Sequence, residues 1–363
     1  MWHEIHEQPR AVADTLALYT EGDTLGPAFV TDVAAWSHSS RDIVIAASGS
    51  SRHAALHGKS ILESLAGVAT HVRYASEYEL ATEEVLHDPA VMVISQSGET
   101  SDSLAALRLA KLRGLRTLSI TNVPTSRMAL ESMVGLHTAA GPETAIPATK
   151  SFVTQLLLVH LIALAVASAR ATVPEAALRA AVQSLHEIPD LLRRQLHPDA
   201  TTLELSAERC LHAAPLIYLG RGPQCAIACE GALKLAETAY VPARAMPAGE
   251  QKHGPIAMLG EHASLVVLAT RDLAAASSIR RYEKTTQLLQ EIRAHGVDVL
   301  AIATEGDERI ESLSSRSVFT PSVSESLSPF VTIAPLQLLA YHAAVKRGVD
   351  VDRPRHLMKS VRE

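Results

Sequence analysis

The sequence predicts an α/β protein built on two parallel sheets, and two observations carry that prediction. Short apolar runs alternate with longer stretches rich in alanine and leucine along most of the chain. Strands and helices in strict succession favour parallel sheets, because each parallel pair needs a crossover connection. The pattern also divides into two halves that begin alike, each with a strand, a glycine-containing turn and a helix. We therefore expect a duplicated α/β domain.

The expected elements follow in order along the chain. In the first half, strands are expected at residues 42–48, 90–96, 117–121 and 135–139. A long apolar helix at residues 151–169 and a polar helical connector that ends near residue 197 come next. In the second half, strands are expected at residues 215–220, 265–270, 297–304 and 317–320. The turns that open the two halves lie at residues 45–51 and 217–223.

The composition is that of a globular protein with a modest negative charge. The 363 residues suffice for two domains with a core each, and 47% of them are hydrophobic and 20% charged. A formal charge of -6 offers no electrostatic case for binding nucleic acid. The apolar run at residues 156–167 contains His160 and is shorter than the roughly 18 residues that cross a bilayer. We expect neither a nucleic-acid nor a membrane partner.

The cysteines and histidines form no metal-ligand pattern. The three cysteines are too few for a disulfide framework, and Cys225 and Cys229, four residues apart on an expected helix, favour packing. No HxH or HExxH spacing occurs among the 17 histidines. The charged N-terminus is unlike a signal peptide. These features predict a cytoplasmic protein without a metal.

The turn SQSGET at residues 95–100 has the composition of an anion-binding loop. It follows an apolar strand and precedes a helix, so its hydroxyls and backbone N–H groups lie at a helix N-terminus, where an anion is favoured. Without a lysine, the turn suits the phosphate of a small metabolite better than a nucleotide. The alternative is an ordinary helix cap made by Thr100 or Ser101.

A dinucleotide site is the obvious competitor for such turns. The turns at 45–51 and 217–223 place glycines between a strand and a helix, as a Rossmann domain does. Neither completes GxGxxG with an acidic residue on the next strand. NAD binding is therefore not expected.

Three further segments carry polar groups that packing alone does not explain. Glu230, Lys234 and Glu237 share one face of an expected helix; the alternative is a solvated face with an ordinary ion pair. His253 stands in a loop rich in glycine and proline, where catalytic histidines often occur, although a surface histidine would fit as well. The third segment is the basic tail that contains Lys359, for which disorder is the alternative.

These segments together resemble the sugar-isomerase (SIS) family. Within it, they are most similar to the isomerase half of the glutamine–fructose-6-phosphate aminotransferases, which make glucosamine 6-phosphate. The matching stretches are EIHEQPRAVADTL (4–16), SQSGETSDSLAALRLAK (95–111), ATKSFVTQLL (148–157), LGRGPQCAIACEGALKLAETAY (219–240), AGEQKHGPIAML (248–259) and QLLAYHAAVKRGVDVDRPRHLMKSVRE (337–363). The resemblance thus runs nearly from end to end, in one order and spacing.

The resemblance implies two tandem SIS domains, each a five-stranded parallel sheet flanked by helices. The expected organisation is an N-terminal helical segment (1–33), a first SIS domain that binds phosphosugar (34–172), a helical connector (173–206), a second SIS domain (207–347) and a C-terminal tail (348–363). The phosphosugar is expected at the carboxyl ends of the first domain's strands, in line with the general rule for α/β sheets.

The resemblance also implies roles for individual residues. The positions that match the phosphate-binding residues of the family are Ser51, Ser95, Gln96, Ser97 and Thr100. Glu237 matches the base that moves a proton between C1 and C2 of the sugar. Lys234 matches a helper in that proton transfer, and Glu230 matches a polar position on the same helix.

Two more catalytic positions match outside that helix. His253 matches the ring-opening histidine, which in the family reaches in from the partner subunit, so a homodimer is expected. Lys359 matches the tail lysine that forms a Schiff base with the open-chain ketose. An acid-base pair and this amine suffice for aldose–ketose conversion, so no cofactor is expected.

The chain departs from the family pattern in two respects. Ala148 stands where the family has a serine whose hydroxyl faces the sugar, which puts the substrate contacts in question. The sequence also contains no match to the glutaminase half of these aminotransferases. We therefore expect that the chain by itself does not take ammonia from glutamine.

The leading hypothesis is conversion of glucosamine 6-phosphate to fructose 6-phosphate and ammonia. The alternative is synthesis of glucosamine 6-phosphate from fructose 6-phosphate, with free ammonia or a separate glutaminase. A third possibility is the same chemistry on another amino-sugar phosphate, because the hydroxyl missing at Ala148 would change the contacts with the sugar. A non-catalytic phosphosugar sensor is the remaining alternative, but it would not need Glu237, His253 and Lys359.

Overall fold

The computed structural model describes residues 1–79, 86, 88–197 and 199–359. These residues form two compact units. The first-sheet unit comprises Glu7–Glu143, Ala148–Pro189 and the described residues after 357. The second-sheet unit comprises Met1–His6, Thr144–Pro147 and Asp190–Leu357. The domain boundaries expected at residues 34, 173, 207 and 348 stay predictions, and residues 360–363 of the expected tail lie outside the described part.

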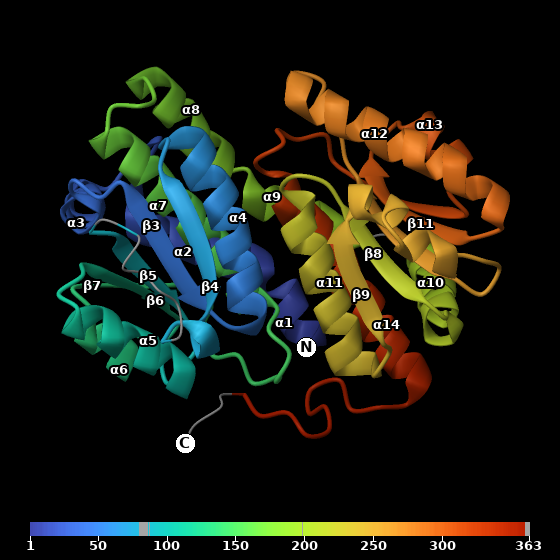
Figure 1. The fold of residues 1–363 in the computed structure, drawn as a ribbon, viewed down its shortest axis with the longest axis horizontal. Helices are drawn as coiled ribbons and strands as arrows, with labels where there is room; N and C mark the ends of the chain where they lie inside the picture. Colours follow the sequence, from blue (N-terminus) through green and yellow to red (C-terminus); the bar gives the residue numbers. More distant parts are fainter. Residues whose placement is uncertain (80–85, 87, 198, 360–363) are drawn as a thin grey trace. The chain divides into compact units, whose positions relative to one another are not determined.

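The first-sheet unit contains a five-stranded sheet in the order β4-β3-β5-β6-β7, with every neighbouring pair parallel (Figure 1). Its strands are β3 (Asp42–Ala47), β4 (Ala69–Tyr74), β5 (Ala90–Ile94), β6 (Thr117–Thr121) and β7 (Val134–His137). Its helices are α2 (Gln8–Tyr19), α3 (Pro27–Ser37), α4 (Gly49–Leu65), the short η1 (Ala75–Glu77), α5 (Ser101–Leu112), α6 (Arg127–Glu131), α7 (Lys150–Ala169) and α8 (Glu175–Leu185). A two-stranded ribbon, β1 (Thr20–Glu21) with β2 (Thr24–Leu25), precedes α3.

The second-sheet unit repeats this topology in the order β9-β8-β10-β11-β12, again with every pair parallel. Its strands are β8 (Leu216–Gly220), β9 (Ala243–Pro247), β10 (Ser264–Ala269), β11 (Asp298–Thr304) and β12 (Arg316–Thr320). Its helices are α1 (Trp2–His6), α10 (Ala200–His212), α11 (Gln224–Ala239), η3 (Ala248–Lys252), η4 (Pro255–Met258), α12 (Ala276–Ile292), η5 (Arg293–His295), α13 (Glu308–Leu313) and α14 (Ser328–Arg347). Helix α9 (Ile188–Gln195) joins the two units in the chain. The predicted fold class, with two five-stranded parallel sheets flanked by helices, is confirmed.

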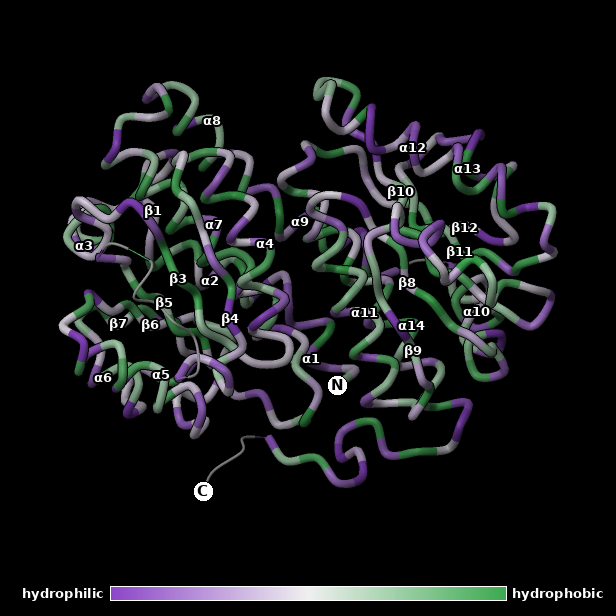
Figure 2. Tube along the Cα trace, viewed as in Figure 1, coloured by the Kyte–Doolittle hydropathy of each residue, from purple (hydrophilic) through white to green (hydrophobic). Residues whose placement is uncertain are grey.

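The central strands of each sheet are buried on both faces, which explains why they are apolar nearly throughout rather than alternating (Figure 2). On one face of the first sheet, Val44, Val91 and Val93 pack with Leu104 and Leu107 of α5. The corresponding face of the second sheet packs against α12 and α13, whose outward sides are hydrophilic. The two cores are thus built mainly from aliphatic side chains, in line with the aromatic content of only 4% of the sequence.

The expected strands omitted β4 and β9, which occupy the same place in the two sheets. Both are edge strands that pair only with the first strand of their sheet. Strand β4 contains His71 and Arg73, and β9 contains Arg244 and ends at Pro247, so neither shows a continuous apolar run. An edge strand is half solvated and tolerates proline, and this weakens its signal in the sequence.

Helices α7 and α14 are long and apolar enough to cross a membrane, but 89% and 83% of their most apolar windows are buried in the fold. Helix α7 has 20 residues, and its bounds lie within one residue of the helix expected at residues 151–169. It packs against α2, α3 and α4 in the first-sheet unit. Its hydrophobicity is accounted for by this central position in a core.

Two buried histidines in the first-sheet unit predict acid sensitivity. The rings of His57 on α4 and His160 on α7 lie 5.8 Å apart between their centroids. Burial and the neighbouring His160 lower the pKa of His57 to about 3, and burial lowers the pKa of His160 to about 4. The folded chain therefore binds fewer protons than the unfolded chain, in which both groups titrate near pH 6.5. Stability is complete above that pH and is lost as the pH falls toward 4.

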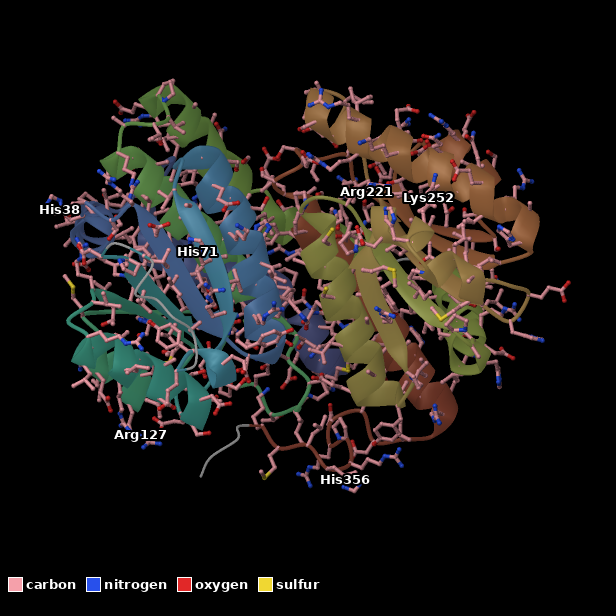
Figure 3. All side chains as sticks on the ribbon, in the orientation of Figure 1. His38, His71, Arg127, Arg221, Lys252 and His356 are labelled. Atoms are coloured by element: carbon pink, nitrogen blue, oxygen red, sulfur yellow. The ribbon has the colours of Figure 1, made fainter. Side chains whose placement is uncertain are left out.

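We expect the free energy of unfolding to decrease by about 1.4 kcal/mol per pH unit for each histidine below pH 6.5. Urea denaturation between pH 7.5 and 5.0 measures this slope. The variant His57→Leu should flatten it, whatever its effect at neutral pH. The matched control is His38→Gln, since His38 is exposed (Figure 3). An equal slope in the His57→Leu and wild-type proteins would contradict the assignment.

Candidate active site

The predicted phosphate residues lie where the strand order of the first sheet reverses. Strands β3 and β5 are neighbours, yet the chain leaves β3 toward β4 on the other side. Helix α4 begins after β3 and carries Ser51 in its first turn, and helix α5 begins after β5 and the turn at 95–100. Such a switch point opens a crevice at the carboxyl ends of the strands. The N-termini of two helices thus meet the predicted phosphate-binding hydroxyls there.

The turn at residues 95–100 is held by its own hydroxyls. The Oγ of Ser95 lies 3.1 Å from the Oγ1 of Thr100 and accepts the N–H of Gly98 at 3.2 Å. The Oγ of Ser97 accepts the N–H of Glu99 at 3.2 Å. Thr100 is the N-cap residue of α5, but its side chain makes no capping hydrogen bond within the described chain. The capping alternative is therefore wrong for the Thr100 side chain, and the first N–H groups of α5 remain available to an anion.

The carboxylate of Glu99 connects this turn to Arg127 at the start of helix α6. It accepts the backbone N–H of Arg127 at 2.8 Å and the Nε–H of the Arg127 guanidinium at 2.7 Å. Glu99 thereby accepts the N–H of the first residue of α6, whose N-cap is Ser126, and is paired with a cation. The sequence showed Glu99 within the turn but offered no signal for this pairing, because Arg127 lies 28 positions away, at the start of α6.

The three polar residues predicted on one helix face come together on α11. The Nζ of Lys234 lies 2.7 Å from Oε2 of Glu237 and 3.4 Å from Oε1 of Glu230. The side chains of Lys234 and Glu230 are fully buried, whereas that of Glu237 is 23% exposed. A solvated face is therefore wrong for this helix. A buried ammonium instead lies between two carboxylates, one of which is open to solvent.

Close packing of α11 places these groups. A Cβ atom at Gly231 would lie 2.8 Å from Leu336 of α14 and 2.9 Å from the ring of Tyr218 on β8. The absence of a side chain at this position lets the helix approach both neighbours. Helix α11 is consequently pressed against the sheet at the turn that bears Glu230 and Lys234.

His253 follows η3 in the second-sheet unit and is exposed. Its backbone N–H donates to the carbonyl of Glu250 at 3.0 Å, and its neighbour Lys252 forms an ion pair with Glu291 of α12. Within the described chain the His253 ring has no hydrogen-bond partner. The unit contains both His253 and Glu237, but the structure records no contact between them.

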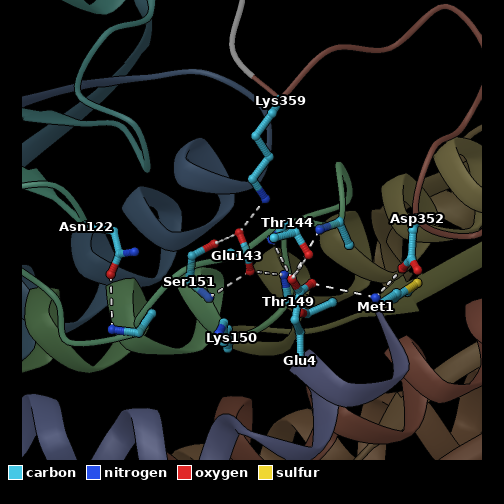
Figure 4. A network of polar contacts seen from close by, with 12 residues as sticks. Met1, Glu4, Asn122, Glu143, Thr144, Thr149, Lys150, Ser151, Asp352 and Lys359 are labelled. Carbon is cyan, nitrogen blue, oxygen red and sulfur yellow. Dashed lines mark hydrogen bonds and ion pairs between the residues drawn. The ribbon is translucent and has the colours of Figure 1, made fainter.

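Lys359 lies in the first-sheet unit, where its ammonium contacts a carboxylate that the sequence did not single out. Its Nζ lies 2.7 Å from Oε2 of Glu143, just before α7 (Figure 4). Burial alone would raise the pKa of the Glu143 carboxyl, but Lys359 and hydrogen bonds from Thr149 and Ser151 outweigh it and hold that pKa below its usual value. Only the fold could show this pair, since 216 positions separate the two residues.

Comparison with known proteins agrees with this geometry. The family model described as "SIS domain" matches residues 38–165 and 211–347, one match in each half of the chain. The chain belongs to the SIS domain family. Its two SIS domains contain the two sheets described above.

Relatives and solved structures agree with that assignment. The chain is 39% identical to the glutamine–fructose-6-phosphate aminotransferase of Chlorobaculum tepidum and 40% identical to that of Symbiobacterium thermophilum. Both alignments cover 99% of this chain but 58% of the relative, so the chain spans somewhat more than half of their length. The C-terminal domain of the Francisella tularensis glucosamine-fructose-6-phosphate aminotransferase superposes with a TM-score of 0.87 at 31% identity, over 97% of each chain. Glucosamine-6-phosphate deaminase from Thermotoga maritima shares the fold, with a TM-score of 0.69 at 22% identity over 92% of this chain and 99% of that chain.

The second SIS domain has the same switch point, but there the first residue of α11 is a buried glutamine bonded to neighbouring side chains. There the Nε2 of Gln224 donates to Thr270 at 3.1 Å and to Ser328 at 2.9 Å, and its Oε1 accepts from Thr332 at 2.9 Å. Gln224 is the first residue of α11, where an anion would otherwise meet the helix. The duplicated SIS domains therefore differ at this position, and the predicted phosphate residues occur in the first.

Replacing Gly98 by alanine is expected to damage the turn of the first SIS domain. Gly98 has a φ of 64°, and a Cβ atom there would lie 2.6 Å from Cβ of Ser126 and 3.0 Å from Cγ2 of Thr121. The variant Gly98→Ala should weaken phosphosugar binding at least tenfold by isothermal titration calorimetry. The control is Gly114→Ala, since Gly114 has a φ of 74° with nothing within 4 Å, and it should lose only about 1 kcal/mol of stability. Equal binding by both variants would contradict the predicted phosphate site.

Proposed function

We propose that this SIS protein converts glucosamine 6-phosphate to fructose 6-phosphate and ammonia. The observation that carries the proposal is the buried ion-pair cluster on α11, in which Lys234 contacts both Glu230 and the partly exposed Glu237. A carboxylate beside a fixed ammonium is suited to moving a proton between adjacent carbons. The hydroxyl-lined switch point of the first SIS domain supports a phosphorylated substrate.

The proposed mechanism uses these groups in sequence. The switch-point hydroxyls and helix N-termini bind the phosphate, which orients the sugar. The exposed His253 opens the ring, and Glu237 takes the proton from C2 and returns it to C1. Lys234 stabilises the negative charge that develops during the transfer. The resulting C2 imine reacts with one water molecule, which yields the ketone oxygen of fructose 6-phosphate and releases ammonia.

Synthesis in the opposite direction is the second candidate, and one observation favours it. The relatives at 39% and 40% identity are named aminotransferases that act on fructose 6-phosphate. The same proton transfer, run from C1 to C2 of a fructose imine, gives glucosamine 6-phosphate. The two directions share every residue named above, so only product measurements separate them.

The purified chain is expected to release ammonia and fructose 6-phosphate in equal amounts from glucosamine 6-phosphate. A coupled glutamate dehydrogenase assay measures the ammonia, and phosphoglucose isomerase coupling measures the ketose. The reverse assay supplies fructose 6-phosphate with ammonium at matched concentrations. A synthetic initial rate more than tenfold above the deamination rate would overturn the proposed direction. Binding without turnover in either assay would favour the phosphosugar sensor, and a panel of amino-sugar phosphates tests the effect of Ala148.

The proposal includes a cytoplasmic homodimer in which His253 completes the partner's site. The exposure of His253 and the lack of a hydrogen-bond partner for its ring within the described chain support this arrangement. Mixing an inactive Glu237→Gln protein with an inactive His253→Ala protein tests it, because mixed dimers would regain one intact site. No recovery of activity after subunit exchange would contradict the shared site.

A further inference from the structure

The carboxylate of Glu143 has an unusually complete set of donors. Its Oε1 accepts the N–H groups of Thr149 at 3.0 Å and Ser151 at 3.2 Å, and its Oε2 accepts the hydroxyl of Ser151 at 2.7 Å. Three of its hydrogen bonds thus come from the start of α7 (Figure 4). The Glu143 side chain is fully buried. A buried anion at a helix N-terminus is stabilised by the helix, and its position is set by that helix.

The fourth donor is the ammonium of Lys359, at 2.7 Å from Oε2. Lys359 follows a segment that contains no helix or strand between α14 and residue 359. Regular secondary structure therefore does not hold its side chain in place. A charge-assisted hydrogen bond to a rigid carboxylate can do so, and such bonds are about twice as strong as neutral ones.

The position of Lys359 Nζ is accordingly coupled to α7 through Glu143. We propose that Glu143 is the positioning residue for Lys359, holding its nitrogen at the start of α7 so that it can form an iminium with an open-chain ketose phosphate. This inference rests on the proposed function for the open-chain ketose phosphate that Lys359 would meet, and on the observed contacts for the anchoring.

The covalent step keeps one positive charge throughout. The Lys359 nitrogen forms a bond to the ketose C2 carbon, and the C2–O bond breaks. Two protons of the former ammonium leave with the carbonyl oxygen as water, and one remains on the iminium nitrogen. An anionic Glu143 is therefore a counter-ion for both the reactant and the product of this step, and no proton has to rest on its carboxyl. The Lys359 ammonium and the hydrogen bonds from Thr149 and Ser151, which hold the pKa of the Glu143 carboxyl below its usual value, suit that role.

Reductive trapping tests the proposal directly. The full chain is treated with fructose 6-phosphate and sodium borohydride, and mass spectrometry locates the adduct on the peptide that contains Lys359. The variant Glu143→Gln should lower the trapped yield at least tenfold and shift the pH dependence of trapping. Its KM for the phosphosugar should change less than threefold, since the switch-point turn is untouched. A folded Glu143→Gln protein with wild-type yield and pH profile would overturn the proposal.

Two further variants separate anchoring from chemistry. Ser151→Ala removes one neutral hydrogen bond from the same carboxylate oxygen and keeps the ion pair, so it should trap at least three times as much adduct as Glu143→Gln. Lys359→Met breaks the pair from the other side and does not depend on how Glu143→Gln folds. Amide hydrogen exchange in the last described residues should then be at least tenfold faster. Unchanged exchange would overturn the anchoring, whereas an absent adduct in the wild-type protein would overturn the covalent step at Lys359. Ammonia release from glucosamine 6-phosphate tests the proposed function separately.

Discussion

The variant Glu237→Gln is expected to lose turnover of glucosamine 6-phosphate by about 10³-fold while it still binds the phosphosugar. Glutamine has nearly the same shape as glutamate, but it cannot take a proton from C2. The side chain of Glu237 is the exposed member of the α11 cluster, and its contact with Lys234 at 2.7 Å can persist through the amide oxygen. The loss should therefore appear in kcat. Ammonia release measures turnover, and isothermal titration calorimetry measures binding.

A surface glutamate provides the matched control for this prediction. Glu283 on α12 is 53% exposed and pairs with Arg309, so Glu283→Gln removes a carboxylate without touching α11. We expect its kcat to equal that of the wild-type protein. Turnover in Glu237→Gln within threefold of wild type would show that another group moves the proton, and the assignment of Glu237 as the base would be wrong.

The variant Lys234→Met should destabilise the second SIS domain by about 3 to 5 kcal/mol, because it removes the ammonium from a fully buried ion pair with Glu230. The Glu230 carboxylate would then remain buried without the positive charge of Lys234 beside it. Urea denaturation at pH 7.5 measures the change. The double variant Lys234→Met/Glu230→Gln should recover part of the stability, since it removes the buried negative charge as well.

The control for this variant is an ion pair at the surface. Lys346 lies 3.6 Å from Glu208, and both side chains are solvated, so Lys346→Met should cost less than about 1 kcal/mol. Equal losses of unfolding free energy from Lys234→Met and Lys346→Met would mean that the buried ion pairs on α11 stabilise the protein no more than a surface ion pair does. Destabilisation of the double variant by as much as Lys234→Met alone would point to packing rather than charge.

The central strands and the anion-binding turn were predictable because their signals are local. Strands such as β5 and β10 are buried on both faces, so nearly every residue in them is apolar. The hydroxyls of the turn at 95–100 and the periodicity of Glu230, Lys234 and Glu237 can be read within a few residues. The edge strands β4 and β9 could not be found in this way, since half of each is solvated.

Local patterns in the chain are enough to show that it is a duplicated α/β protein and which residues share the turn and the α11 face, because both follow from periodicities of a few residues. What surrounds those residues depends on the packing of distant segments. Packing buries Lys234 and Glu230, bonds Gln224 to Ser328, pairs Glu99 with Arg127 and brings Lys359 to Glu143. Most of these residues meet partners that lie on other elements, and the burial of Lys234 and Glu230 depends on the segments packed against α11. The energy of a buried charge depends on its neighbours in space, and a local pattern does not contain them.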